Sequence, residues 1–409
     1  MSGAPVHVVG ALGIAQTLAW ASSYYLPAML AAPMAAELNV PAPAVYAAFS
    51  GAMVVSALVG PWAGQAIDRR GGRVVLVGTS LTFAFGLAML GLAQGLWTMV
   101  AAWLVIGAAM GAGLYEAAFS SLVRLYGQHA RGAITGITLI AGFASTVGWP
   151  LSAWMDTQFG WRNACLGWAG IHLLIGLPLN AWLPKLPAHA KPERCAAADP
   201  AQAVASVSPS PAPSAPRSGY ATALLAFVFA ATWFISTAMA THLPRMLEAA
   251  GATLAAAIAA GALIGPAQVA GRVLEFGLLR RVHPLLSARL AAVAHPVGVA
   301  VLLTAGPAMA PVFAILHGAG NGILTIAKGT LPLVLFGAQG YGARQGWLMM
   351  PARFAQALSP LLFGFALDAW GANALWLSGA IGLAACGALM LLRAQHKPDS
   401  QVSVLHQER

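Results

Sequence analysis

The sequence predicts an all-α membrane protein of 12 transmembrane helices, arranged in two pseudo-symmetric six-helix bundles. Three observations lead to this fold class: an apolar composition, a dozen long apolar segments, and an internal repeat. Of the 409 residues, 59% are hydrophobic and only 8% are charged, whereas a soluble domain carries about a quarter charged residues. The mean hydropathy is +0.74. This composition excludes an ordinary soluble domain.

The apolar segments are long enough to cross a bilayer, which takes about 20 mostly apolar residues. No stretch shows the strand alternation that a transmembrane barrel would need. The predicted spans cover approximately residues 7–30, 43–67, 74–94, 97–120, 131–155, 163–183, 219–243, 253–275, 285–305, 310–334, 345–368 and 372–393.

The charge distribution predicts how these spans are oriented. The formal net charge is +10. With the N-terminus inside, the outer segments hold only Arg162 and Arg245, an asymmetry that obeys the positive-inside rule. We therefore expect a multi-pass inner (plasma) membrane protein with both termini in the cytoplasm and no nucleic-acid partner. The cations of the cytoplasmic segments are Arg69, Arg70, Arg73, Arg124, Arg131, Lys185, Lys191, Arg194, Arg217, Arg280, Arg281, Arg289, Arg344, Arg393, Lys397 and Arg409.

Several features argue against a secreted, metal-binding or ATP-driven protein. The N-terminus has no basic region or cleavage site, so the first span is expected to be retained. Cys165, Cys195 and Cys386 have neither pairing nor metal-ligand spacing, so we expect no disulfide, metal or cofactor. No G-x-x-x-x-G-K-[ST] loop is present. The chain is thus predicted not to be an enzyme, and any transport is expected to be secondary.

A composition break divides the chain. Residues 184–218 are rich in Pro, Ala and Ser and are predicted to be a disordered cytoplasmic linker, because such a segment cannot bury a core. It separates an N-terminal six-helix bundle (1–183) from a C-terminal six-helix bundle (219–393), which is followed by a cytoplasmic tail (394–409).

The two halves repeat each other at an offset of about 205 to 217 residues. YLPAML (25–30) corresponds to HLPRML (242–247), SALVGPWAGQAID (56–68) to GALIGPAQVAGRVLE (261–275), and GWRNA (160–164) to WGANA (370–374). Such repeats are typical of transporters whose halves are related by an axis along the membrane normal.

The segment GQAIDRRGGR (64–73) joins the second and third predicted spans. It resembles the loop signature of the major facilitator superfamily, G-x-x-x-D-R-x-G-R-R, although Gly72 stands where an Arg is usual. The resemblance implies this superfamily's fold and a role in the cytoplasmic gate; the alternative is an ordinary basic loop that orients the protein. The predicted gate residues are Gly64, Asp68, Arg69, Gly71, Arg73 and Glu116.

Three cations lie inside predicted membrane helices: Arg272, Lys328 and Arg353. An Arg or Lys at the bilayer centre costs about 2.5–3.5 kcal/mol on insertion scales, and few acids are available to neutralise these three. An anionic substrate is therefore predicted, bound by Arg because its planar fork donates two parallel hydrogen bonds to a carboxylate. As alternatives, Lys328 snorkels to the surface and Arg272 pairs with Glu275.

Polar and aromatic residues complete the predicted site. Gln268 lies four residues before Arg272, and Gln356 three after Arg353, so each pair shares a helix face. The full predicted substrate-binding set is Arg272, Arg353, Gln268, Gln356, Tyr24, Trp20, Asn321 and Trp233. The predicted proton-coupling residues are Glu116, His242 and Lys328, with a salt bridge from Glu116 to Arg69 or Arg73 as the alternative role of that acid.

Residues 111–164 resemble the helix 4–5 region of the oxalate/formate and monocarboxylate porters. The matching residues, in order, are Gly111, Gly113, Arg131, Gly136, Gly142, Pro150, Gly160, Trp161 and Arg162. In those families an Arg in helix 8 and a cation in helix 11 bind the carboxylate, and Arg272 and Arg353 occupy similar places. The usual acid–Gly–Trp signature of the first helix is absent; QTLAWASSYY stands instead.

The resemblance implies a monomeric secondary transporter that moves a small, monocarboxylate-like organic anion by alternating access, with a proton or by exchange. Its partners are the small-molecule substrate and membrane lipid. One alternative is a proton-coupled drug or metabolite efflux pump; a non-transporting membrane receptor is another.

Overall fold

The computed structural model describes residues 4–184, 215–279 and 282–392, with only the backbone described for 215–218 and Ile258. Most of the predicted linker (184–218) and the predicted tail (394–409) lie outside these ranges. Within them the chain is helical throughout and contains no strand, as predicted.

The N-terminal half consists of nine α-helices that make six crossings. Its first crossing is broken, since residues 22–25 form a turn between two helices. The helices are α1 (Val6–Ala21), α2 (Leu26–Glu37), α3 (Ala42–Arg70), α4 (Gly72–Gly91), α5 (Leu96–Gly113), α6 (Tyr115–Tyr126), α7 (Arg131–Ile140), α8 (Ala144–Ile171) and α9 (Leu177–Ala181).

The C-terminal half makes six crossings with one helix each. These are α10 (Ala215–Ala249), α11 (Leu254–Gly277), α12 (Pro284–Ala305), α13 (Ala310–Phe336), α14 (Tyr341–Trp370) and α15 (Ala374–Leu391). The 12 crossings of the described chain confirm the predicted fold class.

Glycines with positive φ mark where the chain turns back. The helical stretch Leu96–Ala181 has 86 residues, about 130 Å at 1.5 Å per residue, far more than the ~30 Å of a bilayer core. It reverses at Gly127 (φ 56°) and at Gly160 (φ 79°), so α8 contains the end of one crossing and the start of the next. Gly371 (φ 55°) likewise separates α14 from α15. Glycine suits these turns because it has no Cβ.

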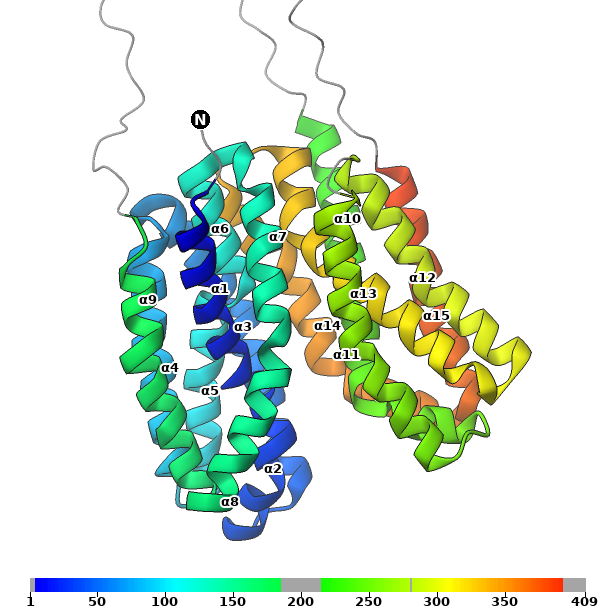
Figure 1. The fold of residues 1–409 in the computed structure, drawn as a ribbon, viewed down its shortest axis with the longest axis horizontal. Coiled ribbons are helices and arrows are strands. Elements are labelled where there is room, and N and C mark those ends of the chain that lie inside the picture. Colours follow the sequence, from blue (N-terminus) through cyan, green and yellow to red (C-terminus); the bar gives the residue numbers. More distant parts are fainter. Residues whose placement is uncertain (1–3, 185–214, 280–281, 393–409) are drawn as a thin grey trace, which may run out of the picture.

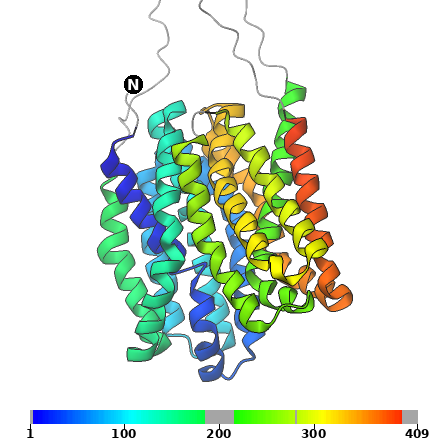
Figure 2. The ribbon, with the colours of Figure 1, turned by 45° about the vertical axis from the view of Figure 1, so that its right-hand side comes forward.

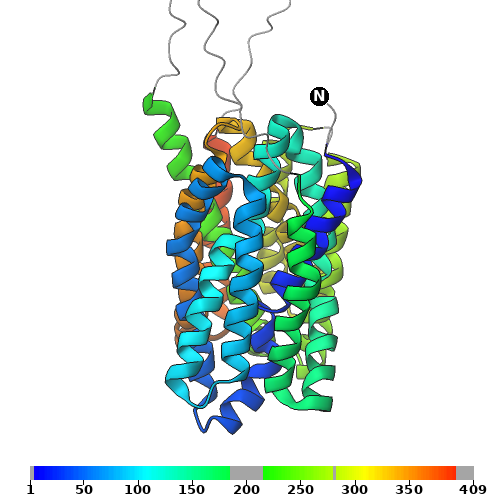
Figure 3. The ribbon, with the colours of Figure 1, turned by 90° about the vertical axis from the view of Figure 1, so that its left-hand side faces the viewer.

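The two halves lie side by side, close together at one end and apart at the other (Figure 1). The chain enters α1 and α10, and leaves α9 and α15, at the end where the halves meet (Figures 1 and 3). We call this the basic end, because Arg69, Arg70, Arg124, Arg131 and Arg344 lie on the helix ends there. In a view turned by 45° the helices of both halves run between the same two ends (Figure 2).

Small residues allow the halves to touch backbone to backbone. A Cβ on Gly64 of α3 would lie 2.0 Å from the carbonyl oxygen of Gly342 in α14, and one on Gly346 would lie 2.5 Å from the Cα of Pro61. Close approach through small residues is how membrane helices gain packing energy in the absence of a hydrophobic driving force. These contacts place the first turns of α14 against α3.

Candidate functional site

The contact between α3 and α14 joins the two halves at the basic end. The Asp68 carboxylate accepts hydrogen bonds from the backbone N–H groups of Gly342 (3.0 Å) and Ala343 (2.8 Å). These are among the free donors of the first turn of α14, where the helix dipole favours a negative charge. Asp68 thus caps a helix of the opposite half.

The basic residues of the same loop contribute no such bond. Arg69 is exposed and Arg73 half-buried, and within the described residues neither forms a hydrogen bond or ion pair. Gly71 (φ 84°) ends α3 and provides the turn into α4. Arg124 donates from Nε to the carbonyl oxygen of Asp68 (3.1 Å).

A second contact at the basic end joins α7 to α11 and the turn after it. Arg131 donates to the Glu275 carboxylate (3.4 Å) and to the carbonyl oxygen of Val282 (3.3 Å). The alternative that Arg272 pairs with Glu275 is therefore wrong. Glu275 is buried and turned toward the other half, so a cation from α7 reaches it.

At the centre of the molecule, Arg353 of α14 binds Glu116 of α6. The two are 2.9 Å apart across the interface, and Arg353 also donates to Gln356 (3.2 Å). The expected salt bridge from Glu116 to Arg69 or Arg73 is therefore wrong. The fourth crossing breaks at Leu114, so Glu116 lies in the first turn of a new helix, turned toward α14 rather than toward the basic loop.

The other two intramembrane cations have no acid partner within the described residues. The Lys328 ammonium lies 4.0 Å from the centre of the Trp233 ring, in a cation–π contact, and the residue is 4% exposed. Lys328 is therefore buried and does not snorkel. Arg272 is 6% exposed and donates to Gln268 (3.5 Å). Its guanidinium also lies against Gly142 of the other half, where a Cβ would meet Nη1.

We call Arg272, Lys328, Arg353 and Glu116 the central cluster. Lys328 lies within electrostatic range of the other three. The cluster therefore contains three cations and one acid in a buried region. A small pocket of about 230 Å³ adjoins the Arg353–Glu116 pair and is also lined by Ser56, Gly111, Gly346 and Met349.

Aromatic rings from both halves surround the central cluster. Trp20 of α1 and Trp233 of α10 stack with ring centres 6.2 Å apart and planes at 8°. Trp20 also contacts Tyr24 (5.4 Å) and Tyr115 (4.9 Å). Trp20 and Trp233 lie in the first crossing of each half, so the stack joins the two bundles.

Two predicted site residues lie elsewhere. Asn321 donates to Ser236 (3.0 Å) and lines a separate pocket inside the C-terminal half. His242, on α10, binds the carbonyl oxygen of Pro360 through Nε2 (2.7 Å). The structure brings together the other predicted binding residues. It adds Tyr115, an aromatic position in the fourth predicted span, and Arg131, which belongs to the porter-like region but was not among the predicted binding residues.

Two six-helix halves that meet at one end around a buried charged centre define the architecture of a membrane transporter. The family model of the Major Facilitator Superfamily matches residues 12–324. The chain therefore belongs to the major facilitator superfamily and is a transporter of small molecules rather than an enzyme. No curated protein sequence matches it.

Solved structures of this superfamily share the fold. The E. coli fucose:proton symporter FucP is similar with a TM-score of 0.71 at 15% identity, over 93% of this chain and 97% of that one. The human organic anion transporter MFSD10 (TETRAN) gives 0.65 at 16% identity, over 93% and 98%. The proton:xylose symporter XylE gives 0.67 at 12% identity, over 94% of each chain. At these identities the likeness shows the fold alone.

Proposed function

We propose that this transporter moves a small organic anion, such as a monocarboxylate, across the inner (plasma) membrane by alternating access. The observation that carries the proposal is the charge of the central cluster, in which three buried cations face one acid. A buried ion costs several kcal/mol of desolvation unless a partner compensates it. Glu116 neutralises Arg353, which leaves Arg272 and Lys328 for an external anion.

Unused hydrogen-bond donors around the cluster support the same proposal. Among the buried donor atoms that have no partner within the described residues are Arg272 Nε, Gln356 Nε2, and Nε1 of both Trp20 and Trp233. An unmade bond of this kind costs about 1–3 kcal/mol. A carboxylate is rich in acceptors and can occupy several donors at once.

The Arg353–Glu116 pair suggests how a proton is coupled. A substrate carboxylate that binds Arg353 displaces Glu116, and a proton on the released Glu116 then returns the cluster to the net charge it had before the anion bound. Lys328 is the second candidate, since its amine can gain a proton when the anion binds and lose it when the anion leaves. His242 is a weaker candidate, because its Nε2 is engaged by the Pro360 carbonyl. Exchange of one anion for another would require no proton.

We propose that the basic end faces the cytoplasm, in line with the positive-inside rule. The bonds of Asp68 to α14 and of Arg131 to Glu275 then hold the cytoplasmic side closed, and the described conformation faces outward. Gly64 and Gly71 provide the close contact and the turn that Asp68 needs. Arg69 and Arg73 are part of the same gate, and their charges form interactions when the gate opens.

The test is an uptake screen in proteoliposomes with radiolabelled mono- and dicarboxylates, with and without a pH gradient. We expect saturable uptake of at least one small carboxylate, stimulated by an inward proton gradient or by carboxylate on the other side. Empty liposomes and protein with Arg272→Gln plus Arg353→Gln are the controls. Carboxylate uptake that is the same in the wild type and in the double variant would contradict the proposal.

A second candidate function is export of a drug or metabolite with an apolar ring, driven by protons. It is favoured by the aromatic rings of Trp20, Tyr24, Tyr115 and Trp233. The positive cluster disfavours a cationic drug. Neutral sugars belong in the same screen, because FucP is a fucose symporter and XylE a xylose symporter. Transport of a neutral or cationic compound without competition by carboxylates would favour these alternatives.

A further inference from the structure

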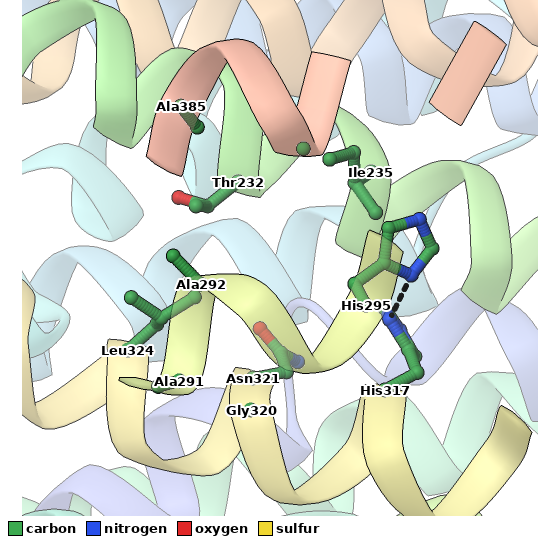
Figure 4. Close-up of a pocket in the computed structure, with 11 residues that line it drawn as sticks. Thr232, Ile235, Ala291, Ala292, His295, His317, Gly320, Asn321, Leu324 and Ala385 are labelled. Carbon is green, nitrogen blue, oxygen red and sulfur yellow. Dashed lines mark hydrogen bonds between the residues drawn. The ribbon is translucent and has the colours of Figure 1, made fainter. Parts of the chain in front are cut away.

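A pocket inside the C-terminal half contains two histidines that the transport site does not use (Figure 4). It encloses about 370 Å³ of space, including its mouth, between α10, α12, α13 and α15. His295 of α12 and His317 of α13 approach each other there, with 3.0 Å between their Nδ1 atoms. Both residues are buried.

The hydrogen bonds around the pair fix where its protons are. The Ser378 hydroxyl donates to the carbonyl oxygen of Leu375 (2.9 Å), so toward His295 Nε2 (3.2 Å) its oxygen can only accept. His295 therefore carries its proton on Nε2, and its Nδ1 is an acceptor. His317 must then donate from Nδ1. The one basic nitrogen left without a proton is Nε2 of His317.

We propose that His317 is a proton-binding site, with Nε2 as the atom to which the proton adds. The new N–H bond makes His317 an imidazolium whose Nδ1–H still donates to His295, so protonation breaks no bond in the chain. The three bonds from His317 through His295 and Ser378 to the Leu375 carbonyl all point the same way. Such a chain polarises cooperatively, and the bond that an imidazolium donates is stronger than the bond that a neutral ring donates.

The pocket provides a route by which a proton can reach His317. Besides the histidines it is lined by Thr232 and Asn321, and Asn321 lies one turn after His317 on the same face of α13. The space is large enough to admit water, which can deliver and remove the proton. Figure 4 shows His317 and Asn321 rising from neighbouring turns of one helix toward this space.

No charged side chain of the described residues lines this pocket. Apart from the two histidines, no titratable group of the described surrounding elements lines the pocket, and the groups nearest to it are engaged elsewhere. Arg289 of α12 donates to the carbonyl oxygen of Leu389, and Arg272 and Glu275 of α11 face the N-terminal half. On α10, His242 binds the carbonyl oxygen of Pro360 and Arg245 binds Asp368. Lys328 of α13 and Arg353 of α14 belong to the central cluster, and Cys386 of α15 is a buried free thiol.

The N-terminal half offers a matched histidine. His172 donates from Nε2 to Ser22 (2.7 Å), whose hydroxyl donates to the Leu18 carbonyl (2.8 Å). It is buried like His317, but it stacks on Phe83 and lacks a second histidine. A neutral hydroxyl is a weaker acceptor for an imidazolium than an imidazole nitrogen is, so His172 should not bind a proton.

The test is a pH titration of the purified full-length protein labelled with ¹⁵N-histidine, with the solvent proton as the probe. Spectra of His317→Gln, His295→Gln and His172→Gln assign the resonances. We expect His295 and His172 to remain Nε2–H tautomers while His317 Nε2 gains a proton on acidification. His295→Gln should lower the midpoint by about one pH unit or more, because the charged ring loses its best acceptor.

A His317 whose Nε2 stays unprotonated down to the pH at which the protein unfolds would overturn the proposal. So would a His317 that carries its neutral proton on Nε2. If His317→Gln does not fold, the pH titrations of the wild type and of His295→Gln still test the proposal. A role for this site as a second proton carrier in transport rests on the proposed function. The titration uses no substrate, so its failure is distinguishable from failure of the carboxylate screen.

Discussion

The Asp68 carboxylate of the N-terminal half accepts a 2.8 Å hydrogen bond from the backbone N–H of Ala343 in the C-terminal half. This bond, with its neighbour from Gly342, exists only while the basic ends of α3 and α14 are together. It therefore stabilises one conformation of the transporter over the other. A helix cap of this kind is worth about 0.5–2 kcal/mol.

Asp68→Asn should lower transport turnover several-fold and leave substrate affinity within a few fold. The amide keeps one acceptor but loses the charge, so the closed basic end is destabilised while the central cluster is intact. Initial rates and equilibrium binding measure the two quantities. Arg70→Gln is the control, since Arg70 is exposed and forms no hydrogen bond or ion pair within the described residues. Lost affinity with preserved turnover would place Asp68 in the binding site instead.

Gly64→Ala should shift the protein toward the conformation in which the basic end is open. Its Cβ would lie 2.0 Å from the Gly342 carbonyl oxygen, so backbone must move. Spin labels on the exposed positions 70 and 339 report the separation of the two halves by electron–electron resonance. Gly78→Ala is the matched control, because a Cβ on that glycine of α4 meets no atom within 4 Å. An unchanged distance distribution in Gly64→Ala would refute this role.

Arg353→Gln should both destabilise the protein and weaken anion binding, and a second substitution separates the two effects. Removing one partner of a buried ion pair costs about 3–5 kcal/mol, because the other charge remains. The double variant Arg353→Gln with Glu116→Gln should recover most of the lost thermal stability but not the anion binding. Recovery of both would show that Arg353 is only structural.

Cys195 should react with membrane-impermeant thiol reagents in inverted vesicles and not in spheroplasts. The residue belongs to the predicted linker, and Cys165 and Cys386 are buried, so Cys195 should dominate the labelling. Serine replacement of Cys195 provides the background. Labelling in intact spheroplasts would contradict the proposed orientation.

The crossings were predictable because apolar length and turn glycines are local properties of a sequence. The break in the first crossing at residues 22–25 was not predicted, since the residues around it remain apolar.

The ion pairs of the site were not predictable in the same way. Glu116 and Arg353 are 237 residues apart, and Arg131 and Glu275 are 144 apart. Sequence spacing on a single helix suggested Glu275 as the partner of Arg272. The expected position of Glu116 near the cytoplasmic end of its helix suggested the basic loop as its partner. Which acid meets which cation depends on how the two halves dock and on the helix break at Leu114. Asn321 was predicted to bind substrate, but it lines a pocket between helices of the C-terminal half, and spacing on its own helix does not predict that packing.

The proposed anion site requires Arg272, which has no acid partner within the described residues, to bind the substrate's negative group. Arg353→Lys keeps the charge but loses the planar fork of the guanidinium. It should therefore bind the substrate more weakly than it would if charge alone determined the affinity. The most direct test is equilibrium binding of a radiolabelled carboxylate from the uptake screen to purified wild type, Arg272→Gln, Arg353→Gln and Arg353→Lys. We predict saturable binding to the wild type that other carboxylates displace and neutral sugars do not, weakened at least tenfold in either Gln variant. Unchanged affinity in both Gln variants would contradict the anion site.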